Sequence, residues 1–415
     1  MQFAAKGHRV TGADVNPRVV ASVNDGVTPF PGEAGLDERL REAVSAGRLS
    51  ATTDTTEAVS RAEAVVLVVP LFVDERGAPD FGWLDGATRA VAAGMRPGTL
   101  VSYETTLPVG TTRERWAPLL EEGSGLAAER DFSLVFSPER VLTGRVFADL
   151  RRYPKLVGGI GPASAKDGVR FYESVLDFDV REDLPRPNGV WDLGSAEAAE
   201  LAKLAETTYR DVNIALANQF ARFADRAGVD VEAVIDACNT QPYSHIHHPG
   251  IAVGGHCIPV YPRMYLWNDP EAAVVRSARE TNEGMPDHAV ELLADAYGDL
   301  TGAEVLVLGA AYRGGVKETA FSGVFPTVAA LRERGARPYV SDPMYEPGEL
   351  ADLGLTPHTD QPVTAAVVQA DHAAYRELAA DHLPHVRVLV DGRRVTDPAL
   401  WAGVRRLVIG NGALR

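Results

Sequence analysis

The sequence predicts an α/β protein in which two regions of alternating strands and helices flank a helical region. In the first third of the chain, short apolar runs such as Ala64 to Pro70 (AVVLVVP) alternate with alanine- and glutamate-rich segments. Residues 195–228 carry one long helical pattern, and after Gly302 the alternation resumes. Because strands that alternate with helices form parallel, doubly wound sheets, we expect one such sheet near each end of the chain.

The first region contains four segments that are rich in β-branched and other apolar residues. They are His8 to Val15, Ala64 to Pro70, Thr99 to Thr106 and Phe132 to Pro138. We expect each of them to be a buried strand, separated from the next by a helix. The residues before the first strand, MQFAAKG, are typical of the end of a helix followed by a glycine turn.

Asp14 ends the first predicted strand, where a dinucleotide-binding unit places an acidic residue that accepts hydrogen bonds from the adenosine ribose. An aspartate at a strand end is also common in ordinary turns, so both interpretations stay open. Such a unit begins one strand earlier, with a glycine-rich turn that holds the pyrophosphate. The printed sequence contains neither, so we expect a Rossmann-like domain without its first strand and a natural chain that starts upstream of Met1.

The long helical pattern begins at Ser195, a serine three residues before Ala198, and ends at Gly228. At 1.5 Å per residue, about 32 residues give a helix of roughly 48 Å, long enough to connect two domains. Beyond it, residues 303–312, 336–343 and 386–393 predict strands of a second, smaller α/β domain. We therefore expect a Rossmann-like domain at 1–190, a helical domain at 191–297 and a second Rossmann-like domain at 298–415.

The composition indicates a soluble globular protein. Of the 415 residues, 45% are hydrophobic and 24% are charged, and the formal net charge is −16. A charge of this sign argues against nucleic acid or an anionic membrane as a partner, and no apolar run approaches the roughly 20 residues of a membrane-spanning helix. Two cysteines cannot form a disulfide framework, so we expect a reducing, cytoplasmic setting.

Cys257 lies in the glycine-rich segment AVGGHCIPVYP, where the backbone can approach a ligand closely. A thiolate is a good nucleophile for carbonyl carbon, which makes Cys257 a candidate catalytic residue. The competing interpretation is a buried apolar cysteine. Cys238, inside the helical pattern VEAVIDACNT, is the better candidate for that structural role.

Lys203 and Glu139 are two further candidates, each with a competing interpretation. Lys203, on the long helix, is either a surface lysine or a cation that stabilises a developing oxyanion. Glu139 follows a strand and a proline, so it is either a general acid or base or a glutamate at a helix N-terminus. The histidines between residues 245 and 256 lack an accompanying cysteine or acidic pair, and we expect no metal site.

Ten segments together resemble the nucleotide-sugar 6-dehydrogenases, the family of UDP-glucose, GDP-mannose and UDP-N-acetylmannosamine dehydrogenases. In chain order they are GADVN, VVLVVP, GAPDFGWL, ETTLPVGTT, SPERVLTG, PKLVGGI, AKLAETTYRDVNIALANQFA, VGGHCIPV, VLVLGAAY and SDPMYEPG. The resemblance covers essentially the whole chain. The forms GGHCIPV and YRDVNIALAN are most similar to the UDP-N-acetylhexosamine branch.

The resemblance implies an NAD-dependent enzyme that oxidises C6 of a UDP-sugar, here a UDP-N-acetylhexosamine, from the alcohol to the carboxylate. In this family the cysteine adds to the intermediate aldehyde, and the resulting thioester is hydrolysed. By position, Cys257 is the nucleophile and Lys203 stabilises oxyanions. Glu139 helps to activate water, and Thr106 lies beside the nicotinamide and that water.

The same resemblance implies the binding residues and the oligomer. The cofactor-binding residues are Asp14, Pro70, Thr106 and Glu139, and the substrate-binding residues are Arg140, Lys203, Gly254 and Gly255. The long helix forms the core of a homodimer. The glycine-rich NAD loop of the family is absent from the printed sequence.

Five positions in the active-site segments depart from the family pattern. Thr207 replaces an asparagine, and Tyr261 replaces an aspartate that pairs with the lysine. Tyr243, His245 and Ala320 replace an arginine, an asparagine and an arginine. These changes leave a second hypothesis open: a non-catalytic subunit that binds a sugar nucleotide, or an enzyme that stops at the aldehyde.

Overall fold

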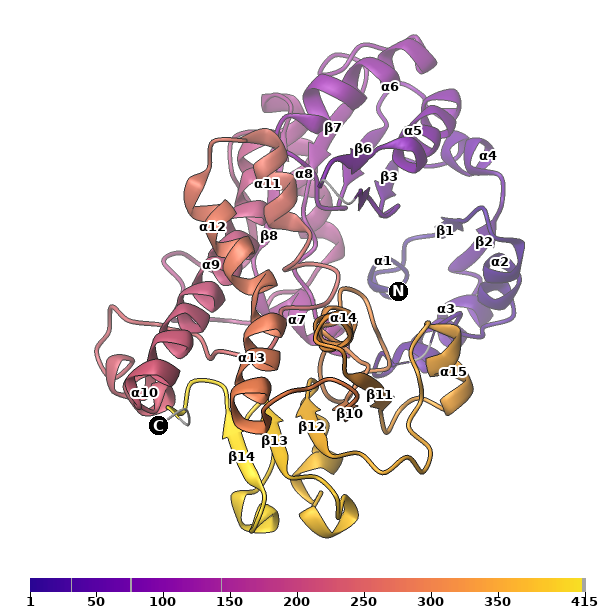
Figure 1. Ribbon diagram of the computed structural model, residues 1–415. Coiled ribbons are helices and arrows are strands. Elements are labelled where there is room, and N and C mark those ends of the chain that lie inside the picture. Colours follow the sequence, from indigo (N-terminus) through magenta and orange to yellow (C-terminus); the bar gives the residue numbers. More distant parts are fainter. Residues whose placement is uncertain (31, 75–76, 143, 413–415) are drawn as a thin grey trace. The chain divides into compact units, whose positions relative to one another are not determined.

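The computed structural model describes residues 1–30, 32–74, 77–142 and 144–412 (Figure 1). The chain divides into two compact units, Met1–Ala205 and Glu206–Arg415, and each is described by itself. The finer division into domains at 1–190, 191–297 and 298–415 stays a prediction. Within these described ranges, no helix combines the length and the apolar character that crossing a bilayer demands.

The first unit contains a five-stranded sheet in the order β3-β6-β7-β8-β9. Its strands are β3 (Ala64–Leu67), β6 (Leu100–Tyr103), β7 (Ser133–Phe136), β8 (Lys155–Gly159) and β9 (Val190–Asp192). Three of them, β6, β7 and β8, are buried along their whole length. The strands predicted within Ala64 to Pro70, Thr99 to Thr106 and Phe132 to Pro138 are confirmed.

A second, two-stranded sheet lies near the start of the chain. β1 (Val10–Ala13) pairs in parallel with β2 (Leu49–Thr52), which confirms the strand predicted within His8 to Val15. In the described part of the unit, neither strand pairs with the larger sheet. The first unit thus carries its strands in two separate sheets of a Rossmann-like α/β fold. A short antiparallel pair, β4 (Phe72–Val73) and β5 (Pro79–Asp80), completes its strands.

The strands predicted in the larger sheet, β3, β6 and β7, run in parallel as expected, whereas β8 is a strand that the sequence analysis did not predict. This strand runs antiparallel to β7, with Phe136 opposite Gly158. After β7 the chain turns back through α7 (Val146–Arg152) instead of crossing over the sheet by a long helix. As a result β8 begins at the edge of the sheet where β7 ends, so Lys155 faces the residues that follow β7.

Helices cover the strands of the first unit. They are α1 (Gln2–Ala5), α2 (Pro17–Asn24), α3 (Leu36–Ser45), α4 (Thr55–Ser60), α5 (Gly82–Gly94), the π-helix η1 (Thr112–Trp116), α6 (Ala117–Ser124) and α8 (Pro162–Val175). Tyr172 and Val175 of α8 pack against Leu100, Val135 and Val157 of the sheet. This contact closes the core beneath the strand ends that carry the candidate residues.

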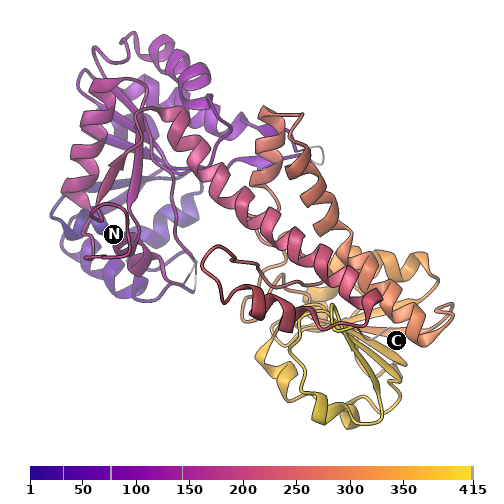
Figure 2. The same ribbon diagram turned by 90° about the vertical axis from the view of Figure 1, so that its left-hand side faces the viewer.

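The long helix is confirmed almost to the residue. α9 (Ala196–Ala227) is one continuous helix (Figure 2). Ser195 caps the start of this helix as predicted: its Oγ accepts a hydrogen bond from the backbone N–H of Ala198 at 3.1 Å. It ends before Gly228, whose φ of +72° suits glycine.

The second unit contains a parallel five-stranded sheet in the order β11-β10-β12-β13-β14. Its strands are β10 (Glu304–Leu308), β11 (Arg337–Ser341), β12 (Ala365–Val368), β13 (Val388–Asp391) and β14 (Arg405–Val408). Its α-helices, besides α9, are α10 (Val231–Cys238), α11 (Tyr261–Asn268), α12 (Ala273–Glu283), α13 (Met285–Tyr297), α14 (Val324–Glu333) and α15 (Pro347–Asp352). The predicted second α/β region is confirmed, and β12 and β14 are strands that the sequence analysis missed.

Candidate active site

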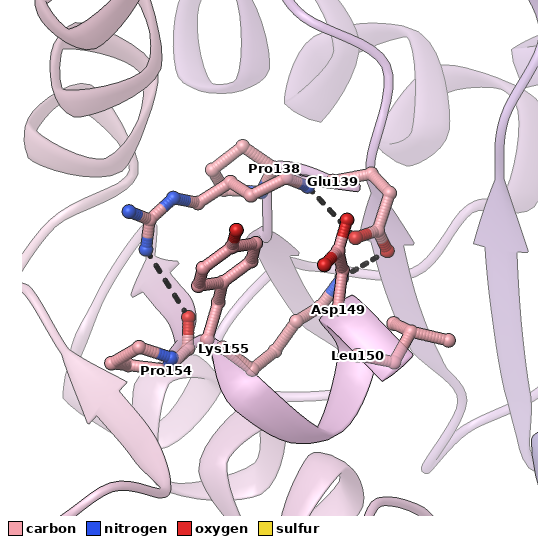
Figure 3. A pocket seen from close by; sticks show the side chains of 8 residues that line it. Pro138, Glu139, Asp149, Leu150, Pro154 and Lys155 are labelled. Carbon is pink, nitrogen blue, oxygen red and sulfur yellow. Dashed lines mark hydrogen bonds and ion pairs between the residues drawn. The ribbon is translucent and has the colours of Figure 1, made fainter. Parts of the chain in front are cut away.

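Glu139 of the first unit lies in a buried cluster of charges at the ends of three strands. Glu104 follows β6, Glu139 follows β7, and Lys155 begins β8. Figure 3 shows Glu139 and Lys155. The Nζ of Lys155 lies 3.0 Å from Oε1 of Glu104 and 3.1 Å from Oε2 of Glu139. The side chains of Lys155 and Glu104 are 6% and 11% exposed, whereas that of Glu139 is 34% exposed. One buried cation therefore bridges two carboxylates, of which Glu139 is the more accessible.

The charges of the cluster stabilise one another. Burial alone would lower the pKa of Lys155, but the charges and hydrogen bonds of Glu104 and Glu139 outweigh it and raise that pKa. The ammonium also lies 4.9 Å from the ring centre of Tyr172. Burial, followed by the charge of Glu104, raises the pKa of Tyr172 well above its usual value. Tyr172 is thus a neutral donor, and its hydroxyl donates to Oε1 of Glu104 at 2.6 Å.

Lys203 and Arg140 contact Glu139 from two other sides. The Nζ of Lys203, on α9, donates to the backbone carbonyl of Glu139 at 2.8 Å. The backbone N–H of Arg140 donates to Oε1 of Glu139 at 2.7 Å. Lys203 is half-buried, so its interpretation as a surface lysine is wrong. The helix N-terminus interpretation of Glu139 is also wrong, because the next helix begins only at Val146.

Thr106 is buried in the loop that follows β6, and this loop is anchored to α9. Glu200 of α9 accepts hydrogen bonds from the N–H of Gly110 at 2.6 Å and from the N–H and hydroxyl of Thr112 at 2.9 and 2.6 Å. Burial raises the pKa of Glu200 to about 7, although these hydrogen bonds oppose the shift. The sequence analysis missed Glu200, and only its place three residues before Lys203 could have drawn attention to it.

A cavity of about 380 Å³ opens beside the charged cluster. It is lined by the charged residues Glu33, Glu104, Glu139 and Lys155 and by mostly apolar side chains, among them Phe3, Phe30, Leu36, Val146, Phe147 and Leu150. Cavities of this size and apolar character, with a few convergent polar groups, are typical of ligand sites. Glu139 is therefore placed between a fixed cation and an accessible space.

The predicted cofactor-binding residues all follow the carboxyl ends of strands that run in parallel. Asp14 follows β1, Pro70 lies shortly after β3, Thr106 after β6 and Glu139 after β7. Doubly wound sheets bind dinucleotides outside these carboxyl ends. Asp14 is exposed, and its carboxylate accepts one hydrogen bond, from the N–H of Asn16 at 2.7 Å. A carboxylate has about four acceptor positions, so Asp14 fits the ribose hydroxyls of a dinucleotide.

Cys257 of the second unit lies in a tight loop that the two preceding glycines permit. Gly255 has a φ of +91°, and its N–H donates to the carbonyl of Ala320 at 2.8 Å. A Cβ at Gly254 would lie 2.6 Å from the Cβ of Tyr312 and 2.9 Å from the carbonyl oxygen of Phe321. Both glycines are therefore required by close packing against the loop after β10. Their role as substrate contacts stays a prediction.

The thiol of Cys257 is exposed, which contradicts its interpretation as a buried apolar cysteine. Its Sγ donates a weak hydrogen bond to Oη of Tyr261, the first residue of α11, at 3.7 Å. The tyrosine that stands in place of an aspartate thus contacts the thiol directly. Cys238, the proposed structural cysteine, is half-buried.

The other departures lie in different surroundings. Tyr243 is 93% exposed, Thr207 is buried on α9, and the carbonyl of Ala320 holds the glycine loop. His245 is exposed, and its backbone carbonyl accepts a hydrogen bond from the side chain of Asn213 at 2.7 Å. The nearby His248 is not a departure, and its Nδ1 lies 2.6 Å from Oε2 of Glu232. Across the described ranges, no three histidine, cysteine or acidic residues are grouped so that they could hold a metal ion.

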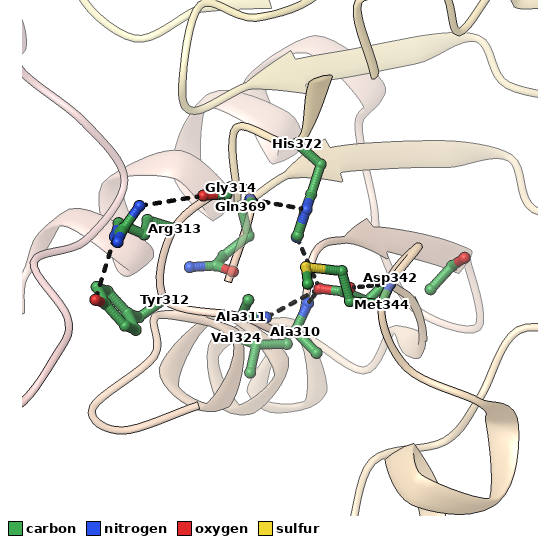
Figure 4. Close-up of polar contacts among 12 residues, drawn as sticks. Ala310, Ala311, Tyr312, Arg313, Gly314, Val324, Asp342, Met344, Gln369 and His372 are labelled. Atoms are coloured by element: carbon green, nitrogen blue, oxygen red, sulfur yellow. Dashed lines mark hydrogen bonds and ion pairs between the residues drawn. The ribbon is translucent and has the colours of Figure 1, made fainter. Parts of the chain in front are cut away.

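The carboxyl edge of the second sheet has a switch point between β10 and β12, the usual position of a ligand in this fold. There the carboxylate of Asp342 accepts the N–H groups of Ala310 and Ala311 at 2.7 and 3.0 Å and lies 3.0 Å from Nε2 of His372 (Figure 4). Arg313 follows directly and donates from Nε to Oη of Tyr312 at 3.2 Å. The sequence analysis assigned no role to Arg313, a cation at this edge.

Three family models match consecutive parts of the chain. They are the NAD binding domain, the central domain and the UDP binding domain of the UDP-glucose/GDP-mannose dehydrogenase family, at residues 1–176, 197–284 and 306–398. Together with the two sheets and their carboxyl edges, these matches define an NAD-dependent dehydrogenase of nucleotide sugars. The chain belongs to the UDP-glucose/GDP-mannose dehydrogenase family.

Relatives resemble the chain over nearly its whole length. The UDP-N-acetyl-D-mannosamine dehydrogenase of Pyrococcus horikoshii is 36% identical over 406 residues, covering 95% of this chain and 92% of that protein. The NDP-N-acetyl-D-galactosaminuronic acid dehydrogenase of Ralstonia solanacearum is 30% identical, covering 97% and 93%. The solved structure of UDP-D-ManNAc dehydrogenase from Pyrococcus horikoshii matches with a TM-score of 0.88 and 33% identity, covering 99% and 96%. These likenesses favour an enzyme over a non-catalytic subunit.

Proposed function

We propose that the chain oxidises a UDP-N-acetylhexosamine at C6, from the alcohol to the uronic acid. Relatives with UDP-N-acetyl-D-mannosamine and NDP-N-acetyl-D-galactosaminuronic acid in their names support this choice of sugar. The observation that carries the proposal is the exposed thiol of Cys257 on its glycine loop, because the second oxidation needs an accessible nucleophile. NAD, when bound, supplies the acceptor for the hydride in each oxidation.

In the proposed reaction, the Cys257 thiolate adds to the C6 aldehyde that the first oxidation forms. The new carbon–sulfur bond gives a thiohemiacetal, and loss of a hydride and a proton converts it into a thioester. The Lys203 ammonium stabilises the oxyanion on the former aldehyde oxygen. Lys203 is supported in this role by its half-burial and by its hydrogen bond to the Glu139 carbonyl.

Glu139 completes the reaction by accepting a proton from the water that attacks the thioester. The carbon–sulfur bond then breaks, which releases the uronic acid and returns the thiol of Cys257. The accessible carboxylate of Glu139 beside the 380 Å³ cavity supports this assignment. Thr106, on the loop that Glu200 anchors, acts in orienting that water and the nicotinamide.

The remaining predicted residues bind rather than react. Asp14, Pro70, Thr106 and Glu139 hold NAD, with Asp14 accepting the ribose hydroxyls. Arg140, Lys203, Gly254 and Gly255 contact the sugar nucleotide. We add Arg313, because a guanidinium beside the switch point of the UDP binding domain is suited to a diphosphate.

We propose a homodimer built on α9. The helix exposes Tyr209, Leu216, Phe220 and Phe223, which are seven, four and three residues apart and so follow one face. Large apolar side chains along one helix face are a common basis of association between subunits. Sedimentation velocity of the unaltered chain should give a dimer, and Phe220→Glu with Phe223→Glu should give a monomer, whereas Phe325→Glu on α14 should not. A monomeric unaltered chain would contradict the proposal.

We also propose a cytoplasmic location. Cys238 and Cys257 are both free thiols, and the proposed chemistry requires Cys257 to stay reduced. A reducing compartment preserves such a thiol, whereas an oxidising one exposes it to disulfide formation.

The substrate choice is tested with UDP-N-acetylglucosamine, UDP-N-acetylmannosamine and UDP-glucose, by following NADH and the uronic acid product. We expect one N-acetylhexosamine to exceed UDP-glucose in kcat/KM by at least about tenfold, since the pocket must accommodate the acetamido group. A preference for UDP-glucose would contradict the choice of sugar. No NADH from any of the three would contradict the proposed function.

A further inference from the structure

We propose that Lys155 is a positioning residue for Glu139: it fixes the carboxylate in place and keeps it ionised, so that Glu139 can accept a proton from water. The inference rests on the proposed function, since it assigns a role to Lys155 at the residue that activates water. Three independent features of the first unit support it: the direction of β8, the contacts of the two Glu139 oxygens and the charge balance of the cluster.

The direction of β8 brings Lys155 to Glu139. In the register of the antiparallel pair, Val135 lies opposite Gly159 and Phe136 opposite Gly158. Because the two strands are antiparallel, each residue further along the chain after β7 lies opposite a residue one position earlier in β8. Glu139, three residues after Phe136, therefore lies opposite Lys155, three residues before Gly158. The hydroxyl of Ser137 donates to the carbonyl of Leu156 at 2.7 Å, which extends this alignment beyond the strand. A parallel β8 would have placed its first residue at the opposite edge of the sheet.

The two oxygens of the Glu139 carboxylate are held by different partners. Oε2 lies 3.1 Å from the Nζ of Lys155, and Oε1 accepts the backbone N–H of Arg140 at 2.7 Å. These contacts occupy one acceptor position on each oxygen, and a carboxylate has about four. The carboxylate is thus fixed in orientation while it retains capacity to bind water on the side of the cavity.

The charge balance makes the lysine necessary for an ionised Glu139. Glu104 and Glu139 both approach the Nζ of Lys155 to within 3.1 Å, and Glu104 is itself fixed by the hydroxyl of Tyr172. Without the cation between them, two carboxylates at one buried site resist ionising together, and one of them retains a proton. A protonated Glu139 cannot accept the proton of the attacking water.

Two further cations near Glu139 donate hydrogen bonds to backbone carbonyls. Lys203 of α9 contacts the Glu139 backbone carbonyl, and a guanidinium nitrogen of Arg140 donates to the carbonyl of Pro154 at 3.3 Å. Glu33 lines the same cavity, and Asp149 and Tyr153 line a smaller pocket next to Glu139. The acids in this set add negative charge near Glu139 and the two cations add positive charge, and Lys155 is a cation in direct contact with the carboxylate itself.

The first test follows the Glu139 carboxyl by 13C NMR in the ligand-free protein labelled with [5-13C]glutamate, with the resonance assigned through Glu139→Gln. In Lys155→Met, which keeps most of the length of the side chain and removes the charge, we expect the Glu139 resonance to titrate at higher pH than in the unaltered chain. Lys155→Arg should keep it near that of the unaltered chain. An unmoved titration in a folded Lys155→Met protein would overturn the inference.

Glu104→Gln provides a second test should Lys155→Met fail to fold. This variant removes the charge of Glu104 and keeps the contact between Lys155 and Glu139. The Glu139 titration should therefore move to lower pH. A shift to higher pH, or no shift, would overturn the inference. Where Lys155→Met folds, adding Glu104→Gln should return the titration toward that of the unaltered chain. A double variant as displaced as Lys155→Met alone would indicate a packing role and overturn the inference as well.

The kinetic consequence separates positioning from general damage. In Lys155→Met, hydrolysis of the thioester should slow most at low pH, where Glu139 is protonated, while the first burst of NADH is retained. The acid limb of the pH–rate profile should move to higher pH, and Glu104→Gln should partly reverse the move. Equal loss of the burst and of hydrolysis would overturn the inference. The NMR titration needs neither NAD nor substrate, so an inactive unaltered chain would refute the proposed function without deciding the role of Lys155.

Discussion

Glu139 in the first unit and Cys257 in the second are held in opposite ways. Glu139 is fixed by Lys155, Arg140 and Lys203, which reach it from a strand, a loop and a helix. Cys257 is exposed on a loop, and its thiol makes a weak hydrogen bond with Tyr261. The difference follows from chemistry: a proton acceptor depends on a fixed electrostatic environment, whereas a nucleophile must first reach its carbonyl carbon.

The largest effect should come from removing the nucleophile itself. Cys257→Ser should lower formation of the uronic acid by on the order of a thousandfold, because a serine hydroxyl without an activating base is a poor nucleophile. The measurement is uronic acid released over time, with NADH followed in parallel. Cys238→Ser is the matched control and should leave the rate unchanged. Equal rates for Cys257→Ser and the unaltered chain would refute the assignment.

The loop beneath Cys257 should be the next most sensitive feature. Gly254→Ala places a Cβ at 2.6 Å from the Cβ of Tyr312, so the loop must shift, and we expect NADH formation to slow by at least about tenfold. Gly348→Ala is the control in the same unit, since a Cβ there has no neighbour within 4 Å. Steady-state kinetics and thermal unfolding of both variants provide the check. Unaltered kinetics in Gly254→Ala would show that the loop does not position the thiol.

The scaffold of the first unit should respond to pH through Glu200. Burial raises its pKa in the folded state to about 7, so the folded protein binds this proton more tightly than the unfolded chain does. The stabilisation is present at low pH and is lost as pH rises toward 7. Relative to the unaltered chain, Glu200→Gln should therefore gain up to about 3 kcal/mol in free energy of unfolding between pH 4.5 and 8, on top of any constant loss.

Urea unfolding at several pH values measures this difference, and Glu197→Gln is the control on the same helix. The hydrogen bond from Arg113 holds the pKa of Glu197 below its usual value. In the unaltered chain this contact stabilises the fold above the ordinary glutamate pKa, and the stabilisation is lost as pH falls below it. Relative to the unaltered chain, Glu197→Gln should therefore show no gain between pH 4.5 and 8 and should gain stability only at lower pH. Parallel pH dependences in the two variants would contradict the account of Glu200.

The smallest effect is expected at Tyr261. Tyr261→Phe removes the hydroxyl that lies 3.7 Å from the thiol, and a weak sulfur hydrogen bond is worth less than about 1 kcal/mol, so the rate should change less than about fivefold. Tyr265→Phe, one turn further along α11, is the control. A hundredfold loss of rate would show that Tyr261 takes part in the chemistry. Cys257 would then depend on a fixed partner, as Glu139 does.

Much of this architecture could be predicted from local patterns. Runs such as AVVLVVP indicated β3, and Ser195 and Gly228 marked the ends of α9, because each signal is contained in a few neighbouring residues. The strands β2, β8 and β9 of the first unit and β12 and β14 of the second were among those missed. β12 is the short apolar run AAVV, which fits a buried helix as well as a strand, and β14 begins with two arginines, so it does not present a clear apolar run.

The partners of Glu139 could not be predicted in the same way. A buried strand has the same composition whichever direction it runs, so PKLVGGI did not indicate that β8 is antiparallel. That direction is what brings Lys155 to Glu104 and Glu139. Local sequence identified Glu139 as a candidate, and tertiary structure was needed to identify what holds it.

The central claim is that the two regions carry out different steps: Cys257 forms the thioester, and Glu139 promotes its hydrolysis. The most direct measurement is intact-protein and peptide mass spectrometry of Glu139→Gln, quenched after incubation with NAD and UDP-N-acetylglucosamine or UDP-N-acetylmannosamine. We predict a thioester adduct that accumulates on the peptide containing Cys257 and is absent from Cys257→Ser/Glu139→Gln. An adduct on another residue, or uronic acid released by Glu139→Gln at the rate of the unaltered chain, would contradict the account.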